Sequence, residues 1–131
     1  MGNNNQKDIS PRIYMQEDGI VVVEFWGEQR EENVRKFTEE TLKLIERSGE
    51  NLNFLIDGTT SFKAANIETR KLYMDFARRV KAKKVAIIGL NALKRVIFSF
   101  ILARIKKEKL KNVGEIKVFA TKEEALDWLR K

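Results

Sequence analysis

The sequence has no cysteine and no histidine. These two absences exclude thiol catalysis, any Ser-His-Asp triad and zinc sites of the usual kind. They also remove the main side chain that titrates near neutral pH. Only carboxylate, lysine, tyrosine or hydroxyl chemistry is left. The sequence therefore predicts a protein that is not an enzyme and that uses no metal or cofactor.

Long apolar runs are also missing. The longest, Val96–Ala103, holds one polar residue and falls far short of the roughly 20 residues that span a bilayer. The N-terminus, MGNNNQKDIS, lacks the apolar core of a secretory signal, and Gln6 at the sixth position makes Gly2 a poor myristoylation site. These features predict a cytoplasmic protein with a disordered N-terminal tail over residues 1–11 and one domain over residues 12–131.

Acidic residues are scarce in the second half of the chain. Residues 1–65 carry a net charge of −4, whereas residues 66–131 carry +11, and between Phe76 and Lys111 the one acid is Glu108. This excess of positive charge in the second half is typical either of solvated helix faces or of a surface for an anionic partner. The candidate basic patch comprises Arg78, Arg79, Lys81, Lys83, Lys84, Lys94, Arg95, Arg104, Lys106 and Lys107.

An acidic protein or an anionic lipid surface fits this patch better than nucleic acid does. Proteins that bind single strands usually add exposed aromatic side chains for base stacking, and the nearby Tyr73, Phe76 and Phe100 fit core stripes instead. No helix-turn-helix or RNA-binding motif is present.

The hydrophobic pattern predicts nine elements in the order ββαβαβαβα. Asp18-Gly19 between two apolar runs indicates a hairpin with a tight primed turn. Alternating helices and strands after it predict an α/β domain with a mixed sheet of about five strands, the later ones parallel. The remaining expected strands are Leu52–Gly58, Val85–Gly89 and Glu115–Phe119; Lys81–Lys84 is expected to be a connector and Val113-Gly114 a turn. The expected helices are Gln29–Arg47, Asn66–Val80, Asn91–Leu110 and one after the capping box at Thr121.

Several segments in this order resemble a known family. VVVEFWG before a long helix, LNFLID, KKVAIIG and above all the ending IKVFATKEEALDWL are similar to the SpoIIAA-like branch of STAS-type domains, over about residues 12–130. The resemblance implies a small bacterial α/β domain related in fold to anti-sigma-factor antagonists and to the CRAL-TRIO lipid-binding fold. It also implies frequent dimerisation and regulation through partner proteins.

One element of the antagonist pattern is missing. In those proteins a helix after the strand equivalent to FLID begins with an Asp-Ser pair whose serine is phosphorylated. Here the corresponding place is Ala64-Ala65-Asn66, which offers no phosphoacceptor. The resemblance therefore does not imply partner switching by phosphorylation at that position.

The segment Ile56–Ser61 is the best candidate for a small-ligand site. It follows the carboxyl end of a strand, where open α/β sheets bind ligands. Its polar side chains are ligand or phosphosite candidates, or they satisfy backbone groups in a turn. They are Asp57, Thr59, Thr60 and Ser61. Glu24, within an apolar strand, is either a buried acid with a functional role or, more simply, the solvent-facing residue of an alternating strand.

The helix Asn91–Leu110 carries two apolar stripes about 140° apart. One comprises Leu93, Val96, Ile97 and Phe100, and the other comprises Phe98, Ile101, Leu102 and Ile105. One stripe can face the sheet, and leaving the other in water would forgo several kcal/mol at about 1.5–3 kcal/mol per side chain. The second stripe is therefore the interface candidate, to be covered by a neighbouring helix, by a second copy of the chain or by lipid.

Together these observations predict a non-catalytic binding or regulatory module of STAS type that forms a homodimer and attracts an acidic protein partner. The alternatives are a carrier of a lipid or another apolar ligand, and a peripheral binder of anionic membranes.

Overall fold

The computed structural model describes residues 11–25, 30–49, 51–59 and 67–131. Within the helix Ala92–Lys107, the side chains of residues 92–94, 96–98 and 100 lie outside this description. The expected N-terminal tail, apart from Pro11, also lies outside it.

The chain opens with the expected antiparallel hairpin. Strand β1 (Arg12–Met15) pairs with β2 (Val21–Glu24). The loop is one residue longer than a tight primed turn, because the Gly19 N–H donates to the Gln16 carbonyl (2.9 Å) and the Gln16 N–H donates to the Ile20 carbonyl (2.8 Å). Gly19 alone takes the left-handed conformation among the loop residues, with φ +84°, as expected for a three-residue hairpin loop.

Alternating helices and strands follow the hairpin, in the order ββαβαβαβα. They are α2 (Glu31–Ser48), β3 (Leu52–Asp57), α3 (Ile67–Arg79), β4 (Ala82–Ile88), α4 (Ala92–Lys107), β5 (Val113–Phe119) and α5 (Lys122–Arg130). The sheet order is β1-β2-β3-β4-β5, with β2 to β5 parallel. The predicted fold class, a single mixed sheet of five strands, is confirmed.

Two strands begin earlier than the sequence predicts. Ala82 pairs with both Leu52 and Val113, so most of the expected connector Lys81–Lys84 belongs to β4 and the expected turn at Val113-Gly114 belongs to β5. The prediction was wrong because Lys83 and Lys84 break the apolar run, whereas the pairing of both neighbouring strands continues through them. The register shifts at Leu52/Asn53, opposite this start of β4.

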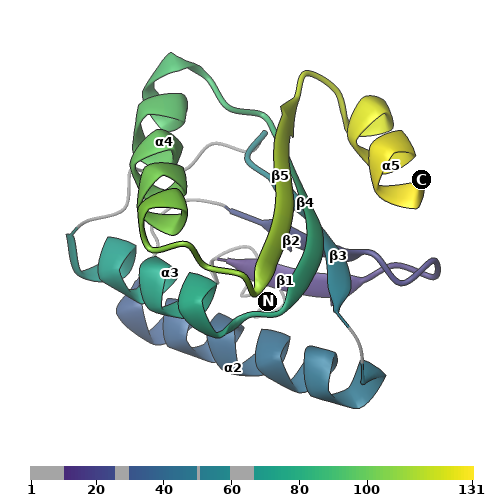
Figure 1. Cartoon of the computed structure of the whole chain (residues 1–131), viewed down its shortest axis with the longest axis horizontal. Coiled ribbons are helices and arrows are strands. Elements are labelled where there is room, and N and C mark those ends of the chain that lie inside the picture. The colour runs from purple at the N-terminus through teal and green to yellow at the C-terminus, as the bar shows by residue number, and fades with distance from the viewer. Residues whose placement is uncertain (1–10, 26–29, 50, 60–66) are drawn as a thin grey trace, which may run out of the picture.

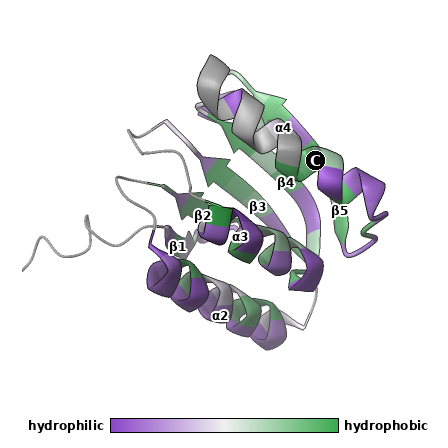
Figure 2. Ribbon diagram, turned by 90° about the vertical axis from the view of Figure 1, so that its left-hand side faces the viewer, coloured by the Kyte–Doolittle hydropathy of each residue, from purple (hydrophilic) through white to green (hydrophobic). Residues whose placement is uncertain are grey.

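The order of the strands decides which face each helix covers. Parallel strands that follow one another across a sheet are joined by right-handed crossovers, which place α2, α3 and α4 on one face. Figure 1 shows α5 on the other side of the sheet from α4, and Figure 2 shows α2 and α3 side by side across the helix-rich face. Of the helices that the structure describes, three thus cover one face of the sheet and one covers the other.

Each face has its own apolar core. On the α2/α3 face, side chains of alternate strand positions pack with Phe37, Ile45 and Val80. On the α5 face, Val22, Leu55 and Ile88 are joined by Ala125 and Leu129 of α5. This alternation is the reason why β2 to β4 read as nearly continuous hydrophobic runs.

Helix α5 begins where the capping motif predicts. Thr121 is the N-cap, and its hydroxyl accepts a hydrogen bond from the Glu124 N–H (3.2 Å). The same hydroxyl donates to the Glu124 carboxylate (3.1 Å). The cap thus fixes the start of the one described helix that covers its face of the sheet.

Two glycines predict a measurable contrast in stability. Gly49, which ends α2, and Gly89, after β4, have φ of +74° and +78°. A Cβ atom at position 49 would meet nothing within 4 Å, whereas one at position 89 would lie 2.3 Å from the Thr59 backbone nitrogen. We expect Gly49→Ala to lower the free energy of unfolding by about 1–2 kcal/mol, the usual cost of a left-handed residue. Gly89→Ala should cost clearly more, and urea unfolding of both variants measures the difference.

Candidate functional site

Asp57 and Thr59 lie together at the carboxyl end of β3, as the sequence predicts. The Asp57 carboxylate accepts hydrogen bonds from the Thr59 N–H (2.9 Å) and from the Thr59 hydroxyl (2.5 Å). The Gly58 N–H donates to the Ile88 carbonyl (2.9 Å), which holds this turn against the end of β4. The bonds have the geometry in which an Asp side chain supports its own turn. Thr60 and Ser61 lie outside the described residues.

Glu24 is the cross-strand neighbour of Asp57, with which it pairs in register between β2 and β3. Since adjacent strands lie about 4.8 Å apart, the two carboxylates are neighbours on the α5 face of the sheet. The Glu24 side chain is 20% exposed, so it is neither a fully buried acid nor an ordinary solvent-facing one. Its carboxylate accepts a hydrogen bond from the Tyr14 hydroxyl (3.2 Å) and lies 3.7 Å from the Arg12 guanidinium.

Arg12 and Tyr14 are members of this cluster that sequence reasoning missed. Partial burial, together with the negative charge of Glu24 and its hydrogen bond, raises the pKa of the Tyr14 hydroxyl. The Arg12 guanidinium also stacks 5.3 Å from the centre of the Tyr14 ring. The hairpin register, which differs from that of the tight turn expected from the sequence, assembles the cluster by placing Arg12 opposite Glu24. The polar side chains of this cluster could bind a polar ligand, or they could bind only one another. In this structure Glu24 is bound by Tyr14 and Arg12 of the same cluster, which is the second arrangement.

The basic patch predicted from the sequence divides into three parts. Most of its members lie where α3 and α4 end and where β4 begins. Lys84 instead points to the α5 face, where its Nζ donates to the Trp128 carbonyl (3.2 Å) and stacks on the Trp128 ring. Arg95, near the start of α4, donates to the Leu90 carbonyl (3.4 Å) at the opposite end of the sheet. The side chain of Lys94 lies outside the described residues.

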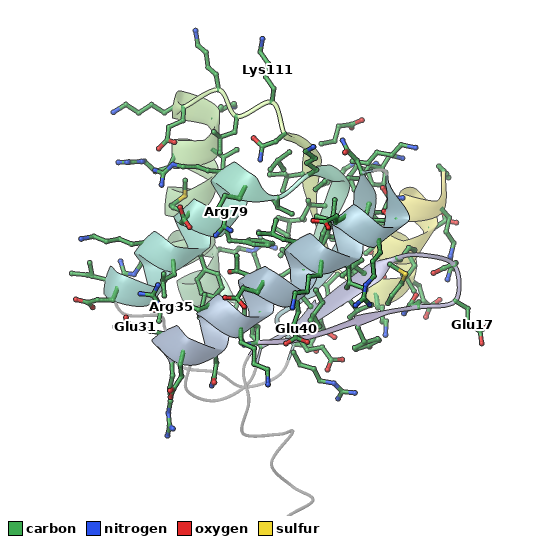
Figure 3. All side chains as sticks on the ribbon, turned by 90° about the horizontal axis from the view of Figure 1, so that it is seen from below. Glu17, Glu31, Arg35, Glu40, Arg79 and Lys111 are labelled. Carbon is green, nitrogen blue, oxygen red and sulfur yellow. The ribbon has the colours of Figure 1, made fainter. Side chains whose placement is uncertain are left out.

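The first part forms a continuous basic edge. We define the basic edge as nine exposed cations: Arg78, Arg79, Lys81, Lys83, Arg104, Lys106, Lys107, Lys109 and Lys111. Asn112 holds the edge together, because its side-chain amide donates to the carbonyls of Ala77 (2.7 Å) and Val80 (2.6 Å) at the end of α3. In the view from below, Lys111 extends away from the body of the protein (Figure 3).

Glu108 lies within the basic edge and binds two of its arginines. Both carboxylate oxygens accept from Arg78 at 2.8 Å, and Arg104 lies 3.4 Å away. The bidentate hydrogen bond from Arg78, followed by the positive charges of Arg78 and Arg104, lowers the pKa of Glu108 to about 2. The contact links the end of α3 to the end of α4.

The apolar stripes of α4 are described in part. Ile101, Leu102 and Ile105 of the interface candidates are half-buried, whereas the side chain of Phe98 and all four members of the other stripe lie outside the described residues. α4 packs beside α3. No α4 side chain among those described belongs to either apolar core. The chain by itself therefore leaves these three side chains partly in contact with water.

A shallow groove lies at the amino ends of the strands. It has a volume of about 490 Å³ and runs between the hairpin loop, the start of β3 and Lys83. Its walls are mixed, with Met15 and Leu52 beside Asp18 and Ser48. No pattern in the sequence indicates this groove, because its lining comes from three separate segments.

Two kinds of site are absent from the described part of the chain. No group of three or more acidic side chains there could hold a metal ion. No helix there combines the length and the hydrophobicity that a bilayer span requires.

Glu108 predicts a pH dependence of stability. Its pKa falls from an ordinary value of 4.5 to about 2 in the folded chain, so its contribution is complete above pH 4.5 and disappears as the pH falls toward 2. We expect Glu108→Gln to lower the melting temperature at pH 7 by a few degrees, and the gap to the parent chain to close between pH 4.5 and 2. Glu39→Gln, which removes an exposed carboxylate from α2, is the matched control. A gap that stays constant across this range would contradict the assignment.

Comparisons with known proteins agree with this architecture. A family model described as SpoIIAA-like matches residues 20–130. The structure is similar to that of an uncharacterised protein of the DUF3478 family with a SpoIIAA-like fold from Shewanella loihica PV-4, at 23% identity and a TM-score of 0.60, covering 92% of both chains. It is also similar to the anti-sigma factor antagonist SpoIIAA in its unphosphorylated form, at 18% identity and a TM-score of 0.62, covering 92% of this chain and 98% of that one. At these identities the two structures show the fold alone. A search of curated proteins finds no match.

Proposed function

This chain belongs to the SpoIIAA-like family, and from that premise we propose that it is a non-catalytic binding module that acts as a homodimer. The observation that carries the proposal is the incomplete burial of apolar side chains on α4. The sequence of this helix is apolar on two sides, and its Ile101, Leu102 and Ile105 are only partly buried in the single chain. Apolar surface that stays in contact with water is a common mark of an interface.

A second copy is the occupant that best fits this surface. The two-fold symmetry of a homodimer pairs the stripe with itself, so apolar side chains meet apolar side chains. Covering the three partly exposed side chains would recover part of the roughly 1.5–3 kcal/mol that each gains on full burial. Among the described helices, α3 is the one with the most contacts to α4.

The polar groups at the carboxyl ends of the strands support a role without catalysis. Asp57 is engaged by Thr59, and Glu24 by Arg12 and Tyr14. A general acid or base needs a free site near its carboxylate for a substrate proton. Regulation by phosphorylation in the manner of an antagonist is not part of the proposal, because Ala64-Ala65-Asn66 contains no hydroxyl group.

The basic edge suggests the kind of partner that the dimer regulates. Its nine cations surround Glu108, and that carboxylate is already bound by Arg78 and Arg104. The exposed lysines of the edge can attract an acidic protein, and such steering would raise the rate of encounter at low ionic strength. We therefore propose an acidic protein surface as the partner.

An anionic membrane surface is the alternative that a specific observation favours. Arg104, Lys106 and Lys107 lie on the same helix as the partly buried Ile101 and Ile105, as in helices that lie on anionic lipid. Such binding would be visible as flotation with anionic vesicles that weakens at high salt. Flotation of the purified chain together with a monomeric mass would favour this alternative over the proposal.

Ile101→Glu tests the dimer. A charge at the centre of the stripe should convert a dimer into a folded monomer, because a buried unpaired carboxylate costs several kcal/mol. The solution mass is measured by light scattering, and folding by circular dichroism. Ala103→Glu is the matched control, since it adds the same charge at an exposed position of the same helix and should leave the dimer intact. A parent chain that is monomeric at high concentration would contradict the proposal.

A further inference from the structure

Strand β5 is an open edge of the sheet. Among the described residues it pairs with β4 alone, and its seven residues make it longer than β1, the four-residue strand at the other edge. Figure 1 shows β5 at the near edge, with α4 to one side and α5 to the other. Val118 is 37% exposed, and Glu115 and Lys117 are also exposed. Long exposed edges of this kind are sites for pairing with another strand.

The two faces of β5 differ in character. Ile116 packs into the core on the α2/α3 face, as Val113 does. Lys117 points to the α5 face, where its Nζ lies 5.6 Å from the ring of Phe119. Glu115 precedes Ile116 and lies two positions from Lys117, so it shares the face of Lys117. Neither Glu115 nor Lys117 forms an ion pair with any described residue.

The sequence VGEIKVF is complementary to itself in one register. Two copies of a strand can pair antiparallel about a two-fold axis that is perpendicular to the sheet. Side chains that lie opposite each other then point to the same face of the sheet. The axis must therefore pass between one residue and the same residue of the second copy. An axis at Glu115 would oppose two glutamates, and an axis at Lys117 would oppose two lysines, both of which are destabilising. An axis at Ile116 places each Glu115 opposite Lys117 of the second copy.

That register has two further advantages. Ile116 is the middle residue of β5, so an axis there pairs the strand from Gly114 to Val118. Val113 and Phe119 pack into opposite faces of the sheet and lie outside this pairing. The register also places Ile116 opposite itself and Val118 opposite Gly114, which keeps the α2/α3 face of the junction apolar. Helix α4 is the last helix on this face and adjoins the β5 edge, so the same axis brings the α4 helices of both copies to the junction.

We propose that two copies of this chain join through antiparallel pairing of their β5 strands, in the register centred on Ile116, and so form one continuous sheet across both copies. The inference rests on the proposed homodimer and defines its geometry. The alternating charges of Glu115 and Lys117 select the register, and the partly buried Ile101, Leu102 and Ile105 of α4 are covered further on one face of the junction.

Charge reversal tests the register. Glu115→Lys sets Lys against Lys at both symmetric contacts, and Lys117→Glu sets Glu against Glu. Each single variant should raise the dimer dissociation constant roughly tenfold, which corresponds to about 1.4 kcal/mol. The double variant should recover the parent value, because it restores both opposite-charge pairs. An equimolar mixture of the two single variants should form heterodimers in native mass spectrometry, and these effects should weaken at high salt.

A single cysteine provides a second readout, because the chain has none of its own. Opposed Cα atoms in an antiparallel pair lie about 4.5 or 5.5 Å apart, within the range that a disulfide spans. Oxidised Ile116→Cys should therefore form a covalent dimer. Val118→Cys is the matched control: its copies would be offset by about four residues, roughly 14 Å along the strands, and should not cross-link.

The outcomes separate this inference from the proposed function. Two results together would overturn the β5 register. The charge variants would dimerise as strongly as the parent chain, and Val118→Cys would cross-link as readily as Ile116→Cys. The homodimer through α4 would survive these results if Ile101→Glu were still monomeric. A parent chain that is monomeric throughout would overturn both proposals.

Discussion

The handedness of the crossovers constrains the rest of this structure. With β2 to β5 lying in sequence order, right-handed connections place α2, α3 and α4 in one layer and leave the other face to α5. The last helix of this layer, α4, contacts α3 and lies beside the last strand of the described sheet. The side of α4 away from α3 and the free edge of β5 therefore meet at one place.

Sequence patterns predicted the elements well wherever one local rule applied. The Asp18-Gly19 pair located the hairpin, and the Thr121 capping motif located the start of α5. The pattern failed at Lys83, where the apolar period breaks but pairing with two neighbouring strands extends β4. Patterns within one segment carry no information on such pairing.

The candidate sites were less predictable from the sequence than the helices and strands were, because most of their contacts join separate segments of the chain. Asp57 and Thr59 were foreseen because they are close in sequence and follow a strand. The pairing of Glu24 with Arg12 and Tyr14, and the two bonds from Asn112 to the end of α3, depend on register and on contacts between residues 10 to 35 positions apart. The predicted basic patch likewise divided, because Lys84 turns to the α5 face whereas its neighbour Lys83 lines the groove at the amino ends of the strands.

The placement of α5 has a consequence for how the protein is made. Helix α5 follows β5 in the chain, yet among the described elements it alone covers the apolar core that includes Val22, Leu55 and Ile88. Asp18 in the first hairpin is also bound by Arg130 at 3.0 Å, over a separation of 112 residues. During translation, the face of the sheet that α5 covers therefore remains bare after β5 has been made and until α5 itself has left the ribosome. Until that point this apolar face is open to contacts with other chains.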